Sequence, residues 1–342
     1  MNKDKDFLGT EPVGKLMFRL AIPTITAQLI NMLYNIIDRI YIGHIPGDGA
    51  LALTGVGVCM PLIMIISAFA ALVGGGGAPR ASISMGKNDL NTAEHILGNC
   101  FFLQILISII LTVILLFGNR TFLLAFGASE NTIEYAVNYM NIYAVGTIFV
   151  QLTLGMNMFI TTQGFAKTGM LSVLIGAVMN IVLDPLFIFV FGLGIKGAAI
   201  ATVISQTLSA AFVLYFLHYK AEYRIRFLSK TELASCSEDA KNIVSLGTAG
   251  FIMQLTNSLV TICANNVLSV TGGDVYISVM TIISSVRQMV ETPIYAITEG
   301  SSPIISYNYG ARRPQKIRQA GITMAVLALI YTLLIWSVIL AA

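Results

Sequence analysis

Long apolar runs recur along this chain and constrain its fold more than any other feature. Nine of them are long enough to cross a bilayer, since a hydrocarbon core about 30 Å thick needs about 20 apolar helical residues. Only 11% of the residues are charged, against about 25% in soluble domains. The runs therefore predict an all-α membrane protein with about nine transmembrane helices. They cover residues 16–43, 51–79, 93–118, 132–159, 169–191, 197–219, 242–270, 275–307 and 319–341.

The Lys and Arg residues between these runs predict the orientation. Sixteen of them fall on the side of the N-terminus, and only Arg120 and Lys196 lie in the opposite loops. Because Lys and Arg are enriched in cytoplasmic loops, we expect a multi-pass protein of the cell membrane with a cytoplasmic N-terminus. The basic residues are not clustered with aromatic ones, as a nucleic-acid surface requires. We therefore expect membrane lipids as partners, and no nucleic acid.

The chain also repeats itself internally. Residues 20–31 and 246–257 share four identities at an offset of 226 residues, and residues 79–86 match residues 303–310 at an offset of 224. Transporters are often built from such repeats. We predict a complete six-helix lobe over 1–219, a cytoplasmic linker over 220–241 and half of a repeated second lobe, three helices, over 242–342. A full duplication would have twelve spans, so the last three are expected to be missing.

Acidic residues inside the membrane are functional candidates, because each costs about 2.5–3.5 kcal/mol at the centre of a helix. Asp38 lies in the first run and Asp184 in the fifth, and Asn180 precedes Asp184 by one helical turn on the same face. Counted from the expected outer ends, Asp38, Asp184 and Thr202 lie roughly 10 Å below the outer surface. Such oxygen groups can bind Na⁺ or share a proton. We predict a cation site at Asp38, Asn180, Asp184 and Thr202, the first three being ligands if the ion is Na⁺.

Structural explanations compete with this site. Asp38 could pair with its neighbour Arg39, and Asp184 could cap a helix break at Pro185. Other polar and methionine side chains could line a central substrate cavity, although amides also join membrane helices and Met is common in ordinary packing. The candidate cavity residues are Gln28, Asn31, Tyr34, Asn35, Met60, Met156, Gln254 and Asn257.

These residues together resemble the bacterial multidrug and toxic compound extrusion (MATE) transporters, over nearly all the chain from Lys15 onward. The resemblance implies two six-helix lobes around a central cavity, and export of amphipathic, often cationic, compounds in exchange for H⁺ or Na⁺ by alternating access. Family members with a first-lobe cation site carry it on residues that correspond to Asp38, Asn180, Asp184 and Thr202. The matching segments are Leu20–Pro23, Asp38, Gly155–Asn157, Gln163–Gly164, Asn180–Pro185 and Gly192–Thr202.

The resemblance also carries a departure. Another branch of the family uses an acidic residue in the seventh span, and this chain has none between Lys241 and Asp274. We therefore expect the cation site in the first lobe alone. Apart from the coupling ion, H⁺ or Na⁺, no cofactor is expected, and we expect a monomer that handles small drug-like substrates.

Two other functions remain as alternatives. A flippase for lipid-linked saccharides would need several cations in its cavity to hold pyrophosphate, whereas the apolar runs hold almost no cations beyond Arg39 and Arg287. An intramembrane protease would need a Gly-x-Gly-Asp or Gly-x-Ser-Gly context for its catalytic residue, and neither accompanies these acids. We therefore predict a transporter and not an enzyme.

Overall fold

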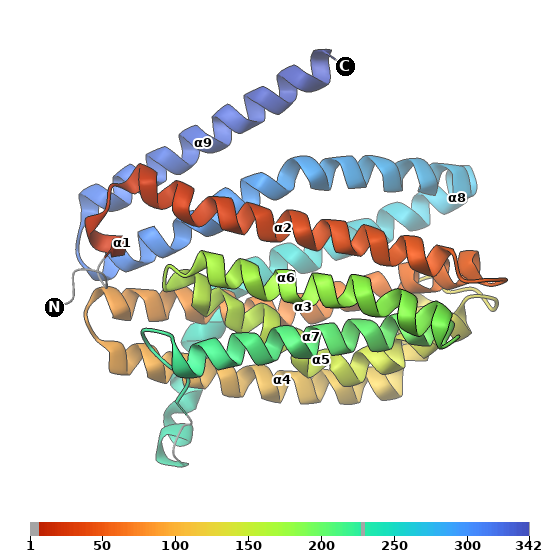
Figure 1. The fold of residues 1–342 in the computed structure, drawn as a ribbon, viewed down its shortest axis with the longest axis horizontal. Coiled ribbons are helices and arrows are strands. Elements are labelled where there is room, and N and C mark those ends of the chain that lie inside the picture. Colours follow the sequence, from red (N-terminus) through yellow and green to blue (C-terminus); the bar gives the residue numbers. More distant parts are fainter. Residues whose placement is uncertain (1–6, 227–229, 342) are drawn as a thin grey trace.

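Long helices make up the protein, which a computed structural model describes over residues 7–226 and 230–341 (Figure 1). Helices form here because a bilayer leaves backbone groups no partners except those within the helix itself. In chain order the elements are α1 (Phe7–Thr10), α2 (Val13–Gly43), α3 (Gly49–Gly86), α4 (Leu90–Ala125), α5 (Ile133–Thr162), α6 (Ala166–Pro185), η1 (Leu186–Val190), α7 (Gly194–Tyr219), α8 (Lys230–Gly310) and α9 (Pro314–Ala341).

Eight helices in the described part of the chain are long and apolar enough to cross a membrane, and they coincide with eight of the predicted spans. The remaining span, 275–307, is also helical, but Arg287, Glu291 and Glu299 lower its hydropathy. Helices α3 and α4 continue beyond their predicted ends, to Gly86 and Ala125. Hydropathy marks only the part of a helix that lies in hydrocarbon, whereas backbone hydrogen bonds carry the helix on into the polar interface.

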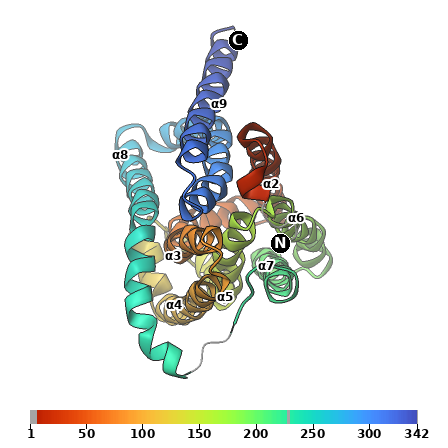
Figure 2. The same cartoon turned by 90° about the vertical axis from the view of Figure 1, so that its left-hand side faces the viewer.

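The longest element, α8, contains two of the predicted spans. Its 81 residues would reach about 120 Å if they were straight. Figure 1 shows instead that α8 runs to one end of the bundle and doubles back, so it forms two antiparallel arms. Residues 230–241 of the predicted linker are the helical start of its first arm. Helix α9 diverges from the bundle (Figures 1 and 2), and nothing in its most apolar stretch is buried.

The internal repeat appears in the packing of α3 against α8. A Cβ atom on Gly86 would collide with the carbonyl oxygen of Tyr307, and one on Gly310 would collide with that of Ile83. Tyr307 and Gly310 are the counterparts of Ile83 and Gly86 at the offset of 224 residues. The same contact therefore occurs twice with the roles exchanged, as expected at a twofold axis. Only glycine lets the two backbones touch here.

Two hydrophobic cores show where the lobes meet. We call the end of the bundle that bears the N-terminus the inner end, and the opposite end the outer end. The inner core combines the first lobe with residues of α8 and α9, including Ile243, Ile297 and Ala320. The outer core, as far as the described side chains show, comes from α2 to α7, with Ile42 and Ile195 among its members. The core that the two lobes share therefore lies at the inner end.

Hydrogen bonds tie the N-terminal segment to the turn between α8 and α9. The Asn308 amide donates to the carbonyl oxygen of Leu8 at 3.0 Å. The Lys316 ammonium donates to the carbonyl oxygen of Gly9 at 2.6 Å, and Arg313 donates to the same oxygen. We call residues 8–11, together with Asn308, Arg313 and Lys316, the N-terminal contact. It joins the start of the first lobe to the second unit.

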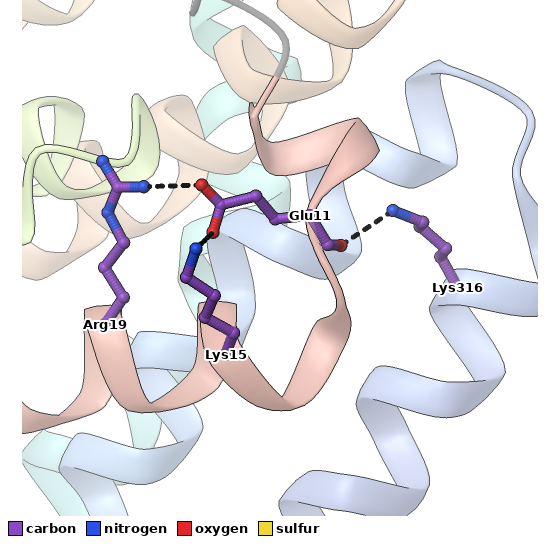
Figure 3. Close-up of polar contacts among 4 residues, drawn as sticks. All are labelled: Glu11, Lys15, Arg19 and Lys316. Atoms are coloured by element: carbon purple, nitrogen blue, oxygen red, sulfur yellow. Dashed lines mark hydrogen bonds and ion pairs between the residues drawn. The ribbon is translucent and has the colours of Figure 1, made fainter.

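Charges within the N-terminal contact are matched (Figure 3). The Glu11 carboxylate pairs with Arg19 at 3.0 Å and with Lys15 at 3.3 Å, while Lys316 binds the backbone oxygen of Glu11 at 3.0 Å. The Arg19 guanidinium also lies over the ring of Phe7, 4.3 Å from its centre. Each cation shown in Figure 3 therefore has an oxygen partner, and the cluster serves to hold the inner end together.

Candidate functional site

The outer half of α6 presents two polar side chains one turn apart. Asn180 is 2% exposed and Asp184 is fully buried. Helix α6 ends at Pro185, and η1 continues the chain as a wider π-helical turn. Proline removes one backbone donor from the ladder, and such π turns often occur at functional sites. The helix break predicted at Pro185 therefore takes the form of a change in helix type, directly after Asp184.

Hydrogen bonds join this part of α6 to α7. The Asn180 amide nitrogen donates to the Asp184 carboxylate at 3.1 Å and to the Thr202 hydroxyl at 3.4 Å. The Thr202 hydroxyl in turn donates to the carbonyl oxygen of Ala198 at 3.0 Å. Both hydrogens of the Asn180 amide are thus engaged, and its carbonyl oxygen remains an acceptor within the cluster. The predicted grouping of Asn180, Asp184 and Thr202 is present.

Asp38 joins the cluster from α2. Its carboxyl group interacts with that of Asp184 across the interface between α2 and α6. No ion pair between Asp38 and Arg39 occurs in the described part of the chain. The Arg39 guanidinium instead lies 3.8 Å from the Met60 sulfur and, with His44, lines a groove at the outer end. The competing explanation is therefore present only as a longer-range electrostatic attraction between Arg39 and Asp38, without an ion pair.

Three buried oxygen atoms in this cluster accept no hydrogen bond. They are Oδ1 of Asp38, Oδ1 of Asn180 and Oδ2 of Asp184. Buried polar atoms nearly always have a partner, and three such oxygens gathered on α2 and α6 can together receive a ligand. Carboxylate and amide oxygens are the groups that hard cations prefer. The described residues contain no group of three or more His, Cys, Asp or Glu side chains placed to hold a metal ion. The oxygen donors of this cluster suit a proton or Na⁺.

Tyr139 on α5 belongs to the cluster, although no motif pointed to it. Its hydroxyl group lies close to the side chain of Thr202 and near enough to Asp38 for an electrostatic interaction. Its ring stacks on that of Tyr143 with 6.0 Å between the centres. The spacing of Tyr135, Tyr139 and Tyr143, one turn apart on one face, was the available signal.

The predicted cavity residues on α2 share one side of that helix. The side chains of Gln28, Asn31, Tyr34 and Asn35 are all partly accessible. The Asn35 amide donates to the carbonyl oxygen of Asn31 at 2.7 Å, which is a bond within α2 and not a bond to a neighbouring helix. The hydrogen bonds of the Asn35 amide therefore do not join α2 to another helix.

The other predicted cavity residues differ in how accessible their side chains are. Met60 and Gln254 are partly accessible and Asn257 is exposed. The prediction for Met156 is wrong, because this side chain is fully buried in the inner core. Its neighbour Gly155 explains the difference. The backbone of Gly155 touches Gly74 of α3, so this part of α5 lies against another helix with no room for a cavity.

Comparison with known proteins identifies a family model and several relatives that resemble this chain. The family model MatE matches residues 23–186 and 249–342. The "Multidrug export protein MepA" of Staphylococcus haemolyticus is 24% identical over 96% of the chain and 72% of its own length. The protein of the same name from Staphylococcus aureus strain NCTC 8325 is 25% identical over 88% of the chain and 66% of its own length. The chain thus spans about two thirds of the length of these relatives.

Solved structures agree with the fold. A multidrug resistance MATE family transporter of the MOP superfamily, in an outward-facing conformation, superposes with a TM-score of 0.89 at 25% identity, covering 99% of this chain and 74% of the other. A MOP superfamily transporter from Pyrococcus furiosus superposes with a TM-score of 0.88 at 24% identity, over 98% and 73%. With three quarters of its residues inside the family model, this multi-pass membrane protein belongs to the MatE family of multidrug efflux transporters.

Proposed function

We propose that the chain acts as a secondary antiporter, which exports amphipathic, often cationic, compounds in exchange for H⁺ or Na⁺ by alternating access. The observation that carries this proposal is the set of unpartnered oxygens on Asp38, Asn180 and Asp184. A buried group of acceptors without a cation is unfavourable unless a cation or proton joins it. Binding and release of that ion is what a coupled transporter requires.

Chemistry of the site supports either ion. Two carboxyl groups that interact across α2 and α6 can share one proton, because two nearby acids resist ionising together. The same carboxylates, with the Asn180 carbonyl and the Thr202 hydroxyl, offer Na⁺ a set of oxygen ligands. Asn180 already donates to Asp184, so it holds that carboxylate in place in both cases. The ion would draw α2 toward α6 and α7.

Packing of the lobes supports the alternating-access part of the proposal. The core that both lobes share lies at the inner end, whereas the outer core comes from the first lobe alone among the described side chains. The outward-facing transporter with a TM-score of 0.89 has a similar arrangement of helices. Because the ion cluster lies in the outer half of the first lobe, ions from the outer side would reach it in this state.

The flippase alternative gains no support from the intramembrane cations. Arg287 pairs with Glu291, four residues further along α8, at 3.9 Å, and Arg39 faces Met60. Both arginines therefore already have partners among the described residues and are not placed together to bind a pyrophosphate. For the same reason we propose small drug-like compounds as the substrates. We also propose that the protein is a monomer in the cell membrane, and that its N-terminus is cytoplasmic, as the distribution of Lys and Arg predicts.

The deciding experiment measures ethidium efflux by cells that express the full chain, with membrane amounts matched. We expect Asp38→Asn and Asp184→Asn each to abolish efflux, because each removes an ionisable ligand of the coupling ion. Glu130→Gln is the matched control, since Glu130 is an exposed acid in the loop between α4 and α5. Normal efflux in both aspartate variants would refute the proposed site.

A second measurement separates the two coupling ions. Proteoliposomes that contain the parent chain are loaded with ethidium, and a proton gradient or a sodium gradient is imposed in turn. The gradient that drives exchange identifies the ion. Exchange that responds to neither gradient would contradict the antiport mechanism itself, whatever the aspartate variants do.

A further inference from the structure

Glu299 is an intramembrane carboxylate that the ion cluster does not use. It lies in the second arm of α8, directly before Gly300. A Cβ atom on Gly300 would come within 2.9 Å of the Cα atom of Ala21, so α8 and α2 touch at this point. Glu299 is therefore held at the line where the second unit meets the first lobe.

Its side chain reaches the polar side of α2. The Glu299 carboxylate lies close to the side chain of Gln28. Gln28 is two helical turns beyond Ala21 and so lies on the same face of α2, the face that meets α8. Glu299 lies deep among protein atoms, yet its side chain remains accessible. Its carboxylate is therefore open to a ligand from outside the chain and is not packed into a core.

Comparison with Glu291, two turns earlier on the same arm, shows what is unusual about Glu299. Glu291 is neutralised by Arg287 at 3.9 Å. Glu299 has no such partner, because no Lys, Arg or His in the described part of the chain forms an ion pair with it. Its neighbour Gln28 is a neutral amide, so no group in the described part of the chain forms an ion pair with Glu299. When this carboxyl group is ionised at such a depth, a cation from outside the protein would stabilise it.

An aromatic ring stands beside this charge. Tyr295 precedes Glu299 by four residues, so the two share one face of α8, and the Tyr295 side chain is 49% exposed. A carboxylate next to an accessible aromatic face is a suitable receptor for a bulky organic cation, since the ring attracts cations and also contacts their apolar groups. A small hydrated ion would gain little from the ring.

We propose that Glu299, oriented by Gln28 and flanked by Tyr295, binds the positive charge of the transported compound. This inference rests on the proposed function and assigns its substrate charge to a residue outside the ion site. Asp38 lies ten residues beyond Gln28 on α2, about 15 Å along the helix. Substrate charge and coupling ion therefore occupy separate acids at two levels of the same helix.

The test uses the purified full chain in detergent and two probes of similar shape, methyltriphenylphosphonium, which is a cation, and triphenylphosphine oxide, which is neutral. We expect Glu299→Gln to weaken phosphonium binding at least tenfold and to change binding of the neutral probe less than twofold. Gln28→Ala should weaken phosphonium binding about threefold, because the carboxylate stays but is no longer oriented. Glu291→Gln, the matched control on the same arm, should change neither.

Each other result overturns the inference in a recognisable way. Phosphonium binding within twofold of the parent in Glu299→Gln removes Glu299 as the receptor. An equal loss for both probes assigns it a role in packing. Unchanged binding with a loss of proton-driven exchange makes Glu299 a proton carrier. If the parent chain binds neither probe, the substrate class in the proposed function fails first and the inference fails with it.

Discussion

Two polar clusters lie at opposite ends of the first lobe, and they differ in how their charges are balanced. In the N-terminal contact, Glu11 faces Lys15 and Arg19, and the Lys316 ammonium binds backbone oxygens (Figure 3). In the ion cluster, Asp38 and Asp184 face each other with amide and hydroxyl groups around them, and three oxygens have no partner. The charged groups of the first cluster are paired within the chain. The two acids of the second form no ion pair in the described part of the chain, and we propose that the coupling ion supplies the missing charge.

This difference follows from where each cluster lies. The N-terminal contact is at the end of the bundle, where water screens its charges and matched pairs hold segments together at little cost. The ion cluster is buried between helices, where an unmatched acid is costly and is retained for function. Removing a residue from the first cluster should therefore change stability, whereas removing one from the second should change ion binding.

Asn180→Ala should have the largest effect. It removes one ligand oxygen and also the hydrogen bond that holds Asp184, and bonds to charged groups contribute about 1.5–3 kcal/mol. We expect roughly 100-fold weaker binding of the coupling ion, measured from the ion concentration that half-saturates exchange. Asn119→Ala is the matched control, since this buried amide donates to Asn141 at 2.6 Å away from the site. Equal losses in both variants would indicate damage to the lobe and not to an ion site.

Tyr139→Phe should have a smaller effect of the same kind. The variant keeps the stacked ring but loses the hydroxyl group that lies close to Thr202 and Asp38, so roughly tenfold weaker ion binding is expected. The half-saturation measurement again applies. Tyr143→Phe is the control on the same face of α5, and it should remain within twofold of the parent. A Tyr139→Phe variant with normal ion binding would exclude the tyrosine from the site.

Lys316→Ala tests the N-terminal contact. It removes two hydrogen bonds to backbone oxygens, and we expect a loss of about 1 kcal/mol in the free energy of unfolding, seen as a lower Tm in detergent. Ion binding should not change. The exposed Lys167 at the start of α6 provides the control, since Lys167→Ala should leave the Tm unchanged. Weaker ion binding in Lys316→Ala would contradict the division between the two clusters.

Asp89 at the start of α4 should show the smallest effect, and one that depends on pH. Hydrogen bonds from Thr92, including one from its backbone at 3.1 Å, hold the pKa of the Asp89 carboxyl below its ordinary value. A lowered pKa in the folded state adds stability above the unfolded pKa, and this is lost as the pH falls through the folded pKa. The Tm of Asp89→Ala should therefore lie slightly below that of the parent at pH 7, and the difference should vanish in acid. A difference that persists in acid would show that the bond is not the cause.

The amino-acid sequence alone determined the class of the protein and most of its helices. Apolar runs of bilayer length permit little besides transmembrane helices, since the backbone must satisfy its own hydrogen bonds in lipid. The internal repeat was also legible, because glycines that bring two backbones together recur at the same offset. Asp38, Asn180 and Asp184 could be found because charge is so rare in these runs that each polar residue stands out.

The tertiary structure decided which residues meet. Tyr139 joined the cluster because α5 lies against α7, and a tyrosine in an apolar run looks the same whether or not its hydroxyl finds Thr202. Met156 left the predicted cavity because Gly155 brings α5 against α3. Arg39 follows Asp38 in the chain yet faces Met60 instead, since neighbours in a helix point about 100° apart. Such outcomes depend on the relative rotation of packed helices, which composition and spacing along one helix do not determine.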